Sequence, residues 1–387
     1  MEFLLNTRDS DGTSEELINN KYTINKLYNV YTPKFTITND ILANIGLVEA
    51  AKEVIENAPL IPIYEARFVK EAMLRTIHHG THLEGNDLSL AEAKRVIEGE
   101  SIAARERDIQ EVINYRRVID YLNELTPRKL PDEEKFHYTQ SVLKKIHELT
   151  CQRILGDEQL GKYRQTQVVV KDSRTREVTF RPPPAIEVPF LLEDFFDWLN
   201  SVDTRKLHPV LRAGIAHYFL VAIHPFIEGN GRMARAFATL ILFAEGYDIK
   251  KFFSLEEYFD KDAAQYYQSL QDVSRQDKDL SDRDLTPWLE YFTQATAVEL
   301  TRIKEKVKRL SVDLKMKGKI GYQIPLNERQ MKLMEYLQEH GSLTTAEARK
   351  VVPEYSDDTL TRDFNYFLKR GIIKKEGKTK AAKYILK

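Results

Sequence analysis

The feature that most constrains the fold of this chain is a short glycine-rich loop that joins two helical patterns. Apolar residues recur at helical spacing over residues 209–223 and again over residues 233–244. Pro209 suits a first helical position, where its missing N–H costs nothing, and Gly246 can end the second helix. The residues between them, His224–Arg235, read HPFIEGNGRMAR. The pattern predicts a loop that is held between two helices and opens directly into the second.

The polar residues of this loop are of the types that bind a diphosphate. Gly229 and Gly231 let the backbone come close to a ligand and present bare N–H groups. The start of the following helix adds unsatisfied N–H donors and the positive end of its dipole. Arg232 and Arg235 are three residues apart, so they share a helix face and can each bind phosphate oxygens in a bidentate manner.

Two further side chains of the loop suggest chemistry beside the diphosphate. Glu228 can hold a divalent cation, because such cations prefer oxygen ligands. His224 titrates near neutral pH and can take the proton of an attacking hydroxyl. The alternative is a glycine-rich turn between two core helices, with its charges facing water. Two glycines alone would favour that turn, whereas the whole constellation favours a functional site.

The stretch resembles the signature of the Fic family, His-x-Phe-x-(Asp/Glu)-Gly-Asn-Gly-Arg-x-x-Arg, and agrees with it at every fixed position. The resemblance implies a helical enzyme that transfers AMP from ATP to a protein hydroxyl with the help of Mg²⁺. It implies that His224 is the base, that Glu228 is the metal ligand and that Phe226 anchors the loop in the core. It also implies that Arg235 holds the γ-phosphate. The ATP-binding residues of the loop would be Gly229, Asn230, Gly231, Arg232 and Arg235.

A second stretch, around Glu84, resembles the inhibitory motif of the same family. Glu84 and Gly85 follow a helix predicted over residues 63–82, and alone they would be an ordinary helix end and turn. The family motif is (Ser/Thr)-x-x-x-Glu-(Gly/Asn), and its Glu pairs with the second arginine of the signature. The resemblance therefore implies that Glu84 inhibits by pairing with Arg235. Gly80 stands where the motif has a hydroxyl, so the anchoring of this helix is left open.

Two β-rich runs, residues 166–170 and 177–180, flank a polar turn and predict a hairpin. In Fic proteins the equivalent segment is a flap that pairs with the extended backbone of the target protein. The resemblance implies that a target protein docks on residues 166–180, and a surface hairpin without a role is the alternative. Tyr266 and Tyr267 resemble the adenine-side wall of the family, with core packing as the alternative.

The C-terminal part of the chain changes character. Helices are predicted over residues 328–340, 345–351 and 357–370, and two short strands over residues 372–377 and 380–386 follow. This order resembles a winged-helix domain. Duplex DNA is one partner that a local basic face would allow, and a protein-docking module is equally open. The bases of this part are Arg362, Lys369, Arg370, Lys374, Lys375, Lys378, Lys380, Lys383 and Lys387.

The predicted fold class is mainly α: a Fic-type helical bundle with a β-hairpin flap, plus a winged-helix domain. A chain of 387 residues can hold two or three domains. We expect an N-terminal region with the inhibitory helix (1–100), whose first part is an irregular arm. The catalytic domain (101–300), a helical linker (301–325) and the winged helix (326–387) would follow.

Composition limits the compartment and the partners. The net charge of −1 gives no global attraction for nucleic acid or membranes. A single cysteine, Cys151, excludes an intrachain disulfide and suits a reducing compartment. The first residues do not resemble a signal peptide, and no apolar run is long enough to span a bilayer. We expect a soluble cytoplasmic protein without a membrane partner, and a homodimer is left open.

The predicted function is protein adenylyltransfer: a target Ser, Thr or Tyr hydroxyl attacks the α-phosphate of ATP, and pyrophosphate leaves. Glu84 would inhibit this reaction, and the reverse reaction, removal of AMP, is left open with Glu84 orienting a water. The alternative is a DNA-binding regulator whose Fic core only senses nucleotide. His224 argues against that alternative, because a sensor needs no base.

Overall fold

The computed structural model describes residues 31–58, 60, 62–126, 135–171, 178–318, 326–377 and 382–386. The chain forms two compact units, Met1–Val307 and Lys308–Lys387. The first unit unites the predicted N-terminal region with the predicted catalytic domain. The finer division into four parts stays a prediction. The first part of the N-terminal arm, the turn of the hairpin, the end of the linker and the tip of the wing lie outside the described residues.

The first unit is helical, as predicted. Its long helices and its hairpin strands are listed here in chain order: α2 (Asn39–Glu56), α3 (Pro62–His82), α4 (Leu90–Ile97), α5 (Glu106–Leu125), α6 (Gln140–Cys151), β1 (Val170–Lys171), β2 (Val178–Phe180), α7 (Val188–Asn200), α8 (Pro209–Ile223), α9 (Asn230–Ala244), α10 (Leu255–Lys261), α11 (Ala263–Ser274) and α12 (Thr286–Gly318). Short 3₁₀ turns at Ala185–Glu187, Thr204–Lys206, Ile249–Lys251 and Leu280–Asp282 connect some of them.

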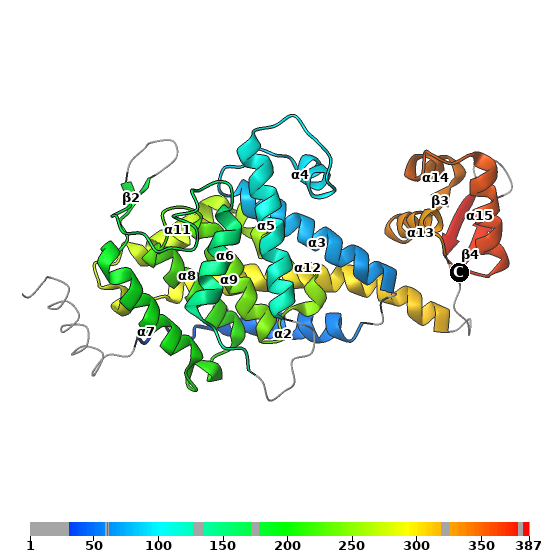
Figure 1. Cartoon of the computed structure of the whole chain (residues 1–387). Helices are drawn as coiled ribbons and strands as arrows, with labels where there is room; N and C mark the ends of the chain where they lie inside the picture. Colours follow the sequence, from blue (N-terminus) through cyan, green and yellow to red (C-terminus); the bar gives the residue numbers. More distant parts are fainter. Residues whose placement is uncertain are drawn as a thin grey trace, which may run out of the picture. The chain divides into compact units, whose positions relative to one another are not determined.

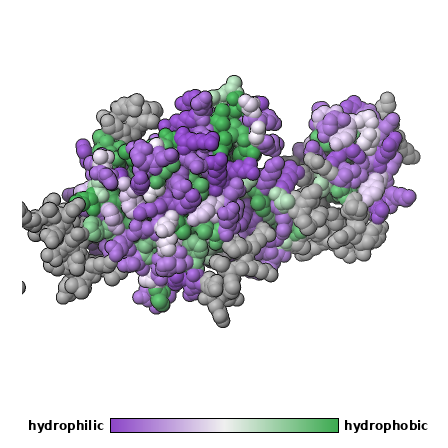
Figure 2. All heavy atoms as spheres, viewed as in Figure 1, coloured by the Kyte–Doolittle hydropathy of each residue, from purple (hydrophilic) through white to green (hydrophobic). Residues whose placement is uncertain are grey.

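The centre of the bundle is the pair α8 and α9, which the other helices of this unit surround (Figure 1). Nearly every residue of both helices is buried, including polar residues such as Arg212 and His217 in α8. A helix that is buried all round belongs in the middle of a core, whereas an amphipathic helix lies at its edge. The visible face of the unit is accordingly mostly hydrophilic, with smaller hydrophobic areas between (Figure 2). The loop between α8 and α9 is therefore held from both sides by deeply buried helices of the unit.

Two predicted details differ from the structure. The strands of the hairpin are shorter than predicted and pair antiparallel with an irregularity between Val170 and Lys171. Tyr31, expected in an irregular arm, is buried, and its ring packs on Trp198 and Phe219.

The second unit contains three helices and a three-stranded sheet. The helices agree with the predicted ranges to within one residue, because capping residues mark their ends: Asn327 and Gln330 form a capping box, and Gly341 ends the first helix at a positive φ. The sheet has the order β3-β5-β4, with both pairs antiparallel. This arrangement supports the winged-helix assignment, which stays a prediction. The elements are α13 (Glu328–His340), β3 (Leu343–Thr344), α14 (Thr345–Val351), α15 (Asp357–Lys369), β4 (Ile373–Glu376) and β5 (Lys383–Leu386).

In the part of the chain that the structure describes, every helix is too short or too polar to cross a membrane.

Candidate active site

His224 ends α8 and stands at the start of the loop. Its backbone is left-handed, with φ 51° and ψ 60°, a conformation that costs a non-glycine residue roughly 1 kcal/mol or more. Its Nδ1 lies 3.0 Å from the carbonyl oxygen of Val221, which can only accept, so Nδ1 carries the proton. Nε2 therefore has a lone pair, as a general base requires. Burial lowers the pKa of His224 and keeps the imidazole neutral.

The loop between the two helices is held by its own side chains. The Asn230 side chain is buried, and its amide bonds the backbone of Phe226 twice: Oδ1 accepts from the N–H at 3.0 Å and Nδ2 donates to the carbonyl at 2.9 Å. Both polar atoms of Asn230 are thus used to shape the loop. Phe226 is fully buried, as an anchor of the loop should be.

Gly229 is required at its position by conformation and by space. Its φ is 75°, and an added Cβ would lie 2.6 Å from the Cys151 sulfur atom. Cys151 is itself fully buried.

Arg235 and Glu84 form the ion pair that the sequence predicts. Arg235 Nη2 donates to Glu84 Oε1 at 2.8 Å and to the carbonyl oxygen of Gly80 at 2.9 Å. The Arg235 side chain is 2% exposed and that of Glu84 is 28% exposed. Burial of the Glu84 carboxyl opposes its charge, but the positive charges of Arg235 and Arg232 outweigh burial and lower its pKa. The pair is therefore charged at neutral pH.

Two glycines make room for this pair. Gly231 lies directly beneath the Glu84 carboxylate, because an added Cβ would collide with Glu84 Oε1. At Gly80 an added Cβ would lie 2.5 Å from Cε1 of Tyr115, whose ring is fully buried. The missing hydroxyl of the inhibitory motif thus has a physical reason: α3 packs too closely on α5 to admit any side chain there.

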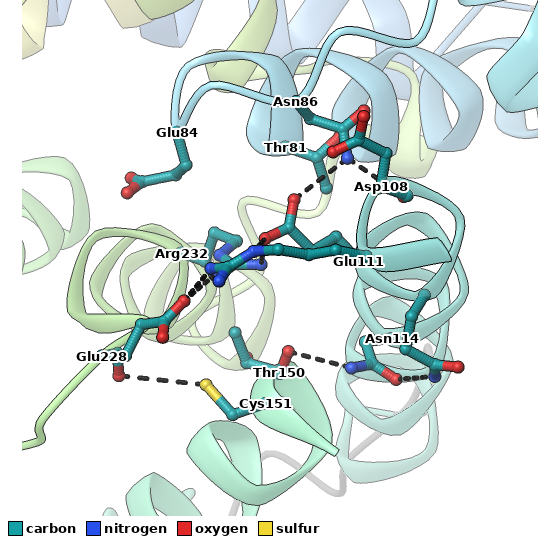
Figure 3. Close-up of polar contacts among 12 residues, drawn as sticks. Thr81, Glu84, Asn86, Asp108, Glu111, Asn114, Thr150, Cys151, Glu228 and Arg232 are labelled. Carbon is teal, nitrogen blue, oxygen red and sulfur yellow. Dashed lines mark hydrogen bonds and ion pairs between the residues drawn. The ribbon is translucent and has the colours of Figure 1, made fainter. Parts of the chain in front are cut away.

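Arg232 takes part in a second cluster of charges. Its Nη1 is 3.3 Å from Glu111 Oε1, and its Nη2 is 3.7 Å from Glu228 Oε1 (Figure 3). Glu111, on α5, also accepts a hydrogen bond of 3.0 Å from Asn86 Nδ2, two residues after Glu84. Arg107, in the first turn of α5, contacts both Glu111 and Glu228. Glu111 therefore links the segment of Glu84 to the charges of the loop.

The buried guanidinium groups of Arg232 and Arg235 have hydrogen-bond donors that the described residues do not use. Arg235 Nε and Arg232 Nε are both buried and make no hydrogen bond with the described residues. Unsatisfied buried donors are costly, and those of an arginine are matched by phosphate oxygens. Both groups lie in the first turns of α9, whose N-terminus itself favours an anion. The geometry thus fits a polyphosphate next to the neutral His224.

The comparison with known families agrees with this geometry. Residues 137–242 match the Fic/DOC family. This segment is a Fic domain.

Curated relatives extend the similarity beyond that segment. The chain is 30% identical over 260 residues to "Protein adenylyltransferase Fic" of Drosophila willistoni, which is 64% of this chain and 48% of that protein. It is 35% identical over 190 residues to the protein of the same name from Drosophila grimshawi, which is 47% of this chain and 35% of that protein. The chain thus spans a third to a half of the length of these relatives.

Solved Fic structures share the fold. A Fic family protein from Desulfovibrio desulfuricans superposes with a TM-score of 0.62 at 22% identity, over 92% of this chain and 98% of that one. Fic-1 from C. elegans superposes with a TM-score of 0.54 at 24% identity, over 80% of both chains. The mainly α Fic fold is thereby confirmed. Glu84, Arg107 and Glu111 lie before the matched segment of the Fic domain.

The sequence did not indicate a role for Arg164, a buried arginine that holds the loop between α8 and α9. Its guanidinium donates to the backbone carbonyls of His224 (2.8 Å), Ile223 (3.4 Å) and Thr166 (3.2 Å), and also to that of Pro183. Its own N–H donates to the carbonyl of Pro225 at 2.9 Å. Arg164 thereby joins the end of α8 to the two ends of the hairpin segment and stabilises the left-handed backbone of His224.

His147, on α6, was also missed. Its ring is stacked on Phe226 at 3.8 Å, Nδ1 accepts from the N–H of Gly161 and Nε2 donates to the carbonyl of Glu228. Burial lowers its pKa to about 4, so the ring is neutral and its tautomer is fixed. Neither residue had a signal in the sequence, because their partners are main-chain atoms far along the chain.

The two tyrosines predicted to face adenine occupy different environments. Tyr266 is 1% exposed, and its hydroxyl lies 3.1 Å from His217 Nε2 in the aromatic core. Its place in an adenine wall stays a prediction, and its side chain points away from that of Tyr267 because adjacent helical residues point in different directions. Tyr267 is 43% exposed, and its hydroxyl donates to the carbonyl of Leu83, next to Glu84. Only Tyr267 of the pair presents a ring to solvent.

Among the predicted site residues, Glu228 fits a divalent cation best. Its carboxylate is 31% exposed and stands beside the start of α9. Groups of three or more metal-ligating side chains are absent from the described residues. One carboxylate suits Mg²⁺ that arrives with a nucleotide, since Mg²⁺ usually keeps waters and phosphates as its other ligands. His79 and His82 instead bond Asp260.

Proposed function

We propose that this chain is a Fic-type protein adenylyltransferase, which transfers AMP from ATP to a Ser, Thr or Tyr hydroxyl of a target protein. The observation that carries the proposal is the contact of His224 Nδ1 with the carbonyl oxygen of Val221, which leaves Nε2 of the neutral ring available to accept a proton. The names of the curated relatives support the same activity.

In the proposed reaction the hydroxyl oxygen bonds to the α-phosphorus while its proton passes to His224 Nε2. The bond from the α-phosphorus to its bridging oxygen breaks, and pyrophosphate leaves. Arg232, Arg235 and the start of α9 would hold the phosphates, with Gly229 and Gly231 admitting them close to the backbone. Mg²⁺ on Glu228 would neutralise charge on the phosphates. The site acts mainly by positioning and charge neutralisation.

Glu84 is proposed to inhibit this reaction. Arg235 has a fixed charge, and Glu84 satisfies it at 2.8 Å in the place that we assign to the γ-phosphate. ATP that binds beside this pair would hold its phosphates out of line for attack. The same carboxylate lies above Gly231 and could orient a water toward AMP on a modified protein, which is how we propose the reverse reaction.

The test is intact-mass analysis after incubation with ATP and Mg²⁺. Glu84→Gly should gain the mass of AMP faster than the unaltered chain, by ~5- to 150-fold if the pair couples with ~1–3 kcal/mol. Adding His224→Ala should remove that gain, because loss of a general base costs ~10²–10⁴-fold. Equal labelling with and without His224 would refute the proposed mechanism, and equal labelling with and without Glu84 would refute the inhibition.

The target is proposed to dock on the hairpin, residues 166–180. Val169 and Val178 are 36% and 41% exposed there, so the hairpin offers apolar side chains as well as strand edges. The cytoplasmic location and the homodimer stay predictions.

Duplex DNA is proposed as the alternative partner, through the second unit. Arg362, Lys369, Lys374 and Lys375 are exposed on α15 and β4. A gel-shift series with the full chain at rising salt tests this, because phosphate contacts predict a steep loss of affinity. Absence of a complex at low salt would favour protein docking.

A further inference from the structure

The carboxylate that we assign to the divalent cation already has a positive partner. Arg107 Nη2 contacts Glu228 Oε1, and Arg107 Nε donates to Glu111 Oε1 at 3.2 Å. The side chain of Arg107 is 57% exposed, whereas that of Arg232, the other cation near Glu228, is 3% exposed. Arg232 is fixed in the core, so Arg107 is the partner that can leave.

Arg107 and a divalent cation compete for the same oxygen. A cation bound to Glu228 Oε1 would lie within a few ångströms of the guanidinium, where like charges repel strongly. The bond from Arg107 Nε to Glu111 does not involve Glu228. Displacement of Arg107 from Glu228 is therefore a local movement that leaves the arginine with one carboxylate partner.

We propose that Arg107 is an internal stand-in for the divalent cation, held on Glu228 until metal-bound nucleotide displaces it. The inference rests on the proposed function, since it takes Glu228 as the cation ligand. The site then contains two complementary ion pairs. Glu84 gives Arg235 the negative charge that a phosphate would supply, and Arg107 gives Glu228 the positive charge that the metal would supply. Arg107 thus raises the cation concentration that the site requires.

The test is direct binding of Mn²⁺, followed by its electron paramagnetic resonance signal. The ligand is an ATP analogue with a methylene bridge between the α- and β-phosphorus, so AMP is not transferred. All variants carry Glu84→Gly, which leaves Arg235 equally available in each. Arg117→Ala is the matched control: Arg117 is exposed on the same helix and donates to Gln152 Oε1.

Arg107→Ala should lower the dissociation constant of Mn²⁺ up to about fivefold, since an exposed ion pair is worth up to ~1 kcal/mol and 1.4 kcal/mol is tenfold. Arg117→Ala should not change it. In a Glu228→Gln background the effect of Arg107→Ala should vanish, because the two side chains then no longer compete. An unchanged or weaker affinity in Arg107→Ala would overturn the inference alone. Failure of every variant to bind the Mn²⁺–nucleotide complex would overturn the proposed function with it.

Discussion

Replacement of Gly80 by Ala should destabilise the chain although alanine is a better helix former than glycine. The added Cβ would lie 2.5 Å from Cε1 of Tyr115, closer than atoms in van der Waals contact. The ring cannot easily yield, because it is fully buried and its hydroxyl donates to Glu256 at 3.1 Å. Overpacking of this kind costs ~1–3 kcal/mol, whereas Gly to Ala in a helix gains up to ~1 kcal/mol.

Gly46→Ala supplies the control for helix propensity. Gly46 lies within α2, and an added Cβ there meets no atom within 4 Å. Gly46→Ala should therefore raise the melting temperature slightly, while Gly80→Ala should not. The difference in stability between the two variants measures the cost of the clash, which we expect to be ~1–3 kcal/mol. At ~2 °C per kcal/mol for a unit of this size, that cost corresponds to a difference in melting temperature of about 2–6 °C. Thermal unfolding measures it.

Gly80→Ala should also weaken the proposed inhibition by Glu84. The carbonyl of Gly80 accepts from Arg235, and Glu84 follows four residues later, so a shift of α3 loosens both contacts. Labelling with AMP should then lie between that of the unaltered chain and that of Glu84→Gly. The reasoning fails if Gly80→Ala is as stable as Gly46→Ala, because the packing of α3 on α5 would then have room for a side chain.

Two further changes test residues that hold the loop. Arg164→Lys should lower the transfer rate in a Glu84→Gly background and leave nucleotide affinity nearly unchanged, because one ammonium cannot reach all the carbonyls that Arg164 binds. Single-turnover experiments measure the rate, and calorimetry measures the affinity. An unaltered rate would contradict the role of Arg164 in holding the loop. His147→Gln should reduce the acid sensitivity of folding. The pKa of His147 is about 4 in the folded chain against ~6.5 when unfolded, so the unfolded state binds the proton first and stability is lost as pH falls from about 6.5 to 4. The slope should fall by up to ~1.4 kcal/mol per pH unit in chemical denaturation, and equal slopes would refute a buried neutral ring.

The sequence predicted those parts of the molecule that local rules govern. The start of α13 follows from the capping box at Asn327, which bonds only a residue three positions away, and its end follows from Gly341. The loop from His224 to Arg235 was recognisable because its functional groups are contiguous. The pairing of Arg235 with Glu84 was predicted only through the family motif, since the partners are 151 residues apart.

Other features depend on contacts that the sequence does not display. Arg164 binds main-chain oxygens, which every residue has, so no partner type could indicate its role. Arg107 also gave no signal, because it lies far along the chain from the stretch His224–Arg235. Its contact with Glu228 results from the packing of α5 beside the loop. The tyrosine pair could not be divided into a buried and an exposed member without knowing how α11 is rotated in the bundle.

The clamp of Arg164 has a consequence for engineering. Because it binds only main-chain carbonyls at the base of the hairpin, the side chains of the hairpin can be replaced without disturbing it. A hairpin from a Fic protein could be grafted between Thr166 and Pro183 while His224 keeps its conformation. Under the proposed function, substrate choice and chemistry would then be separately exchangeable parts, and a library confined to this graft would search for new protein targets while the loop from His224 to Arg235 stays constant.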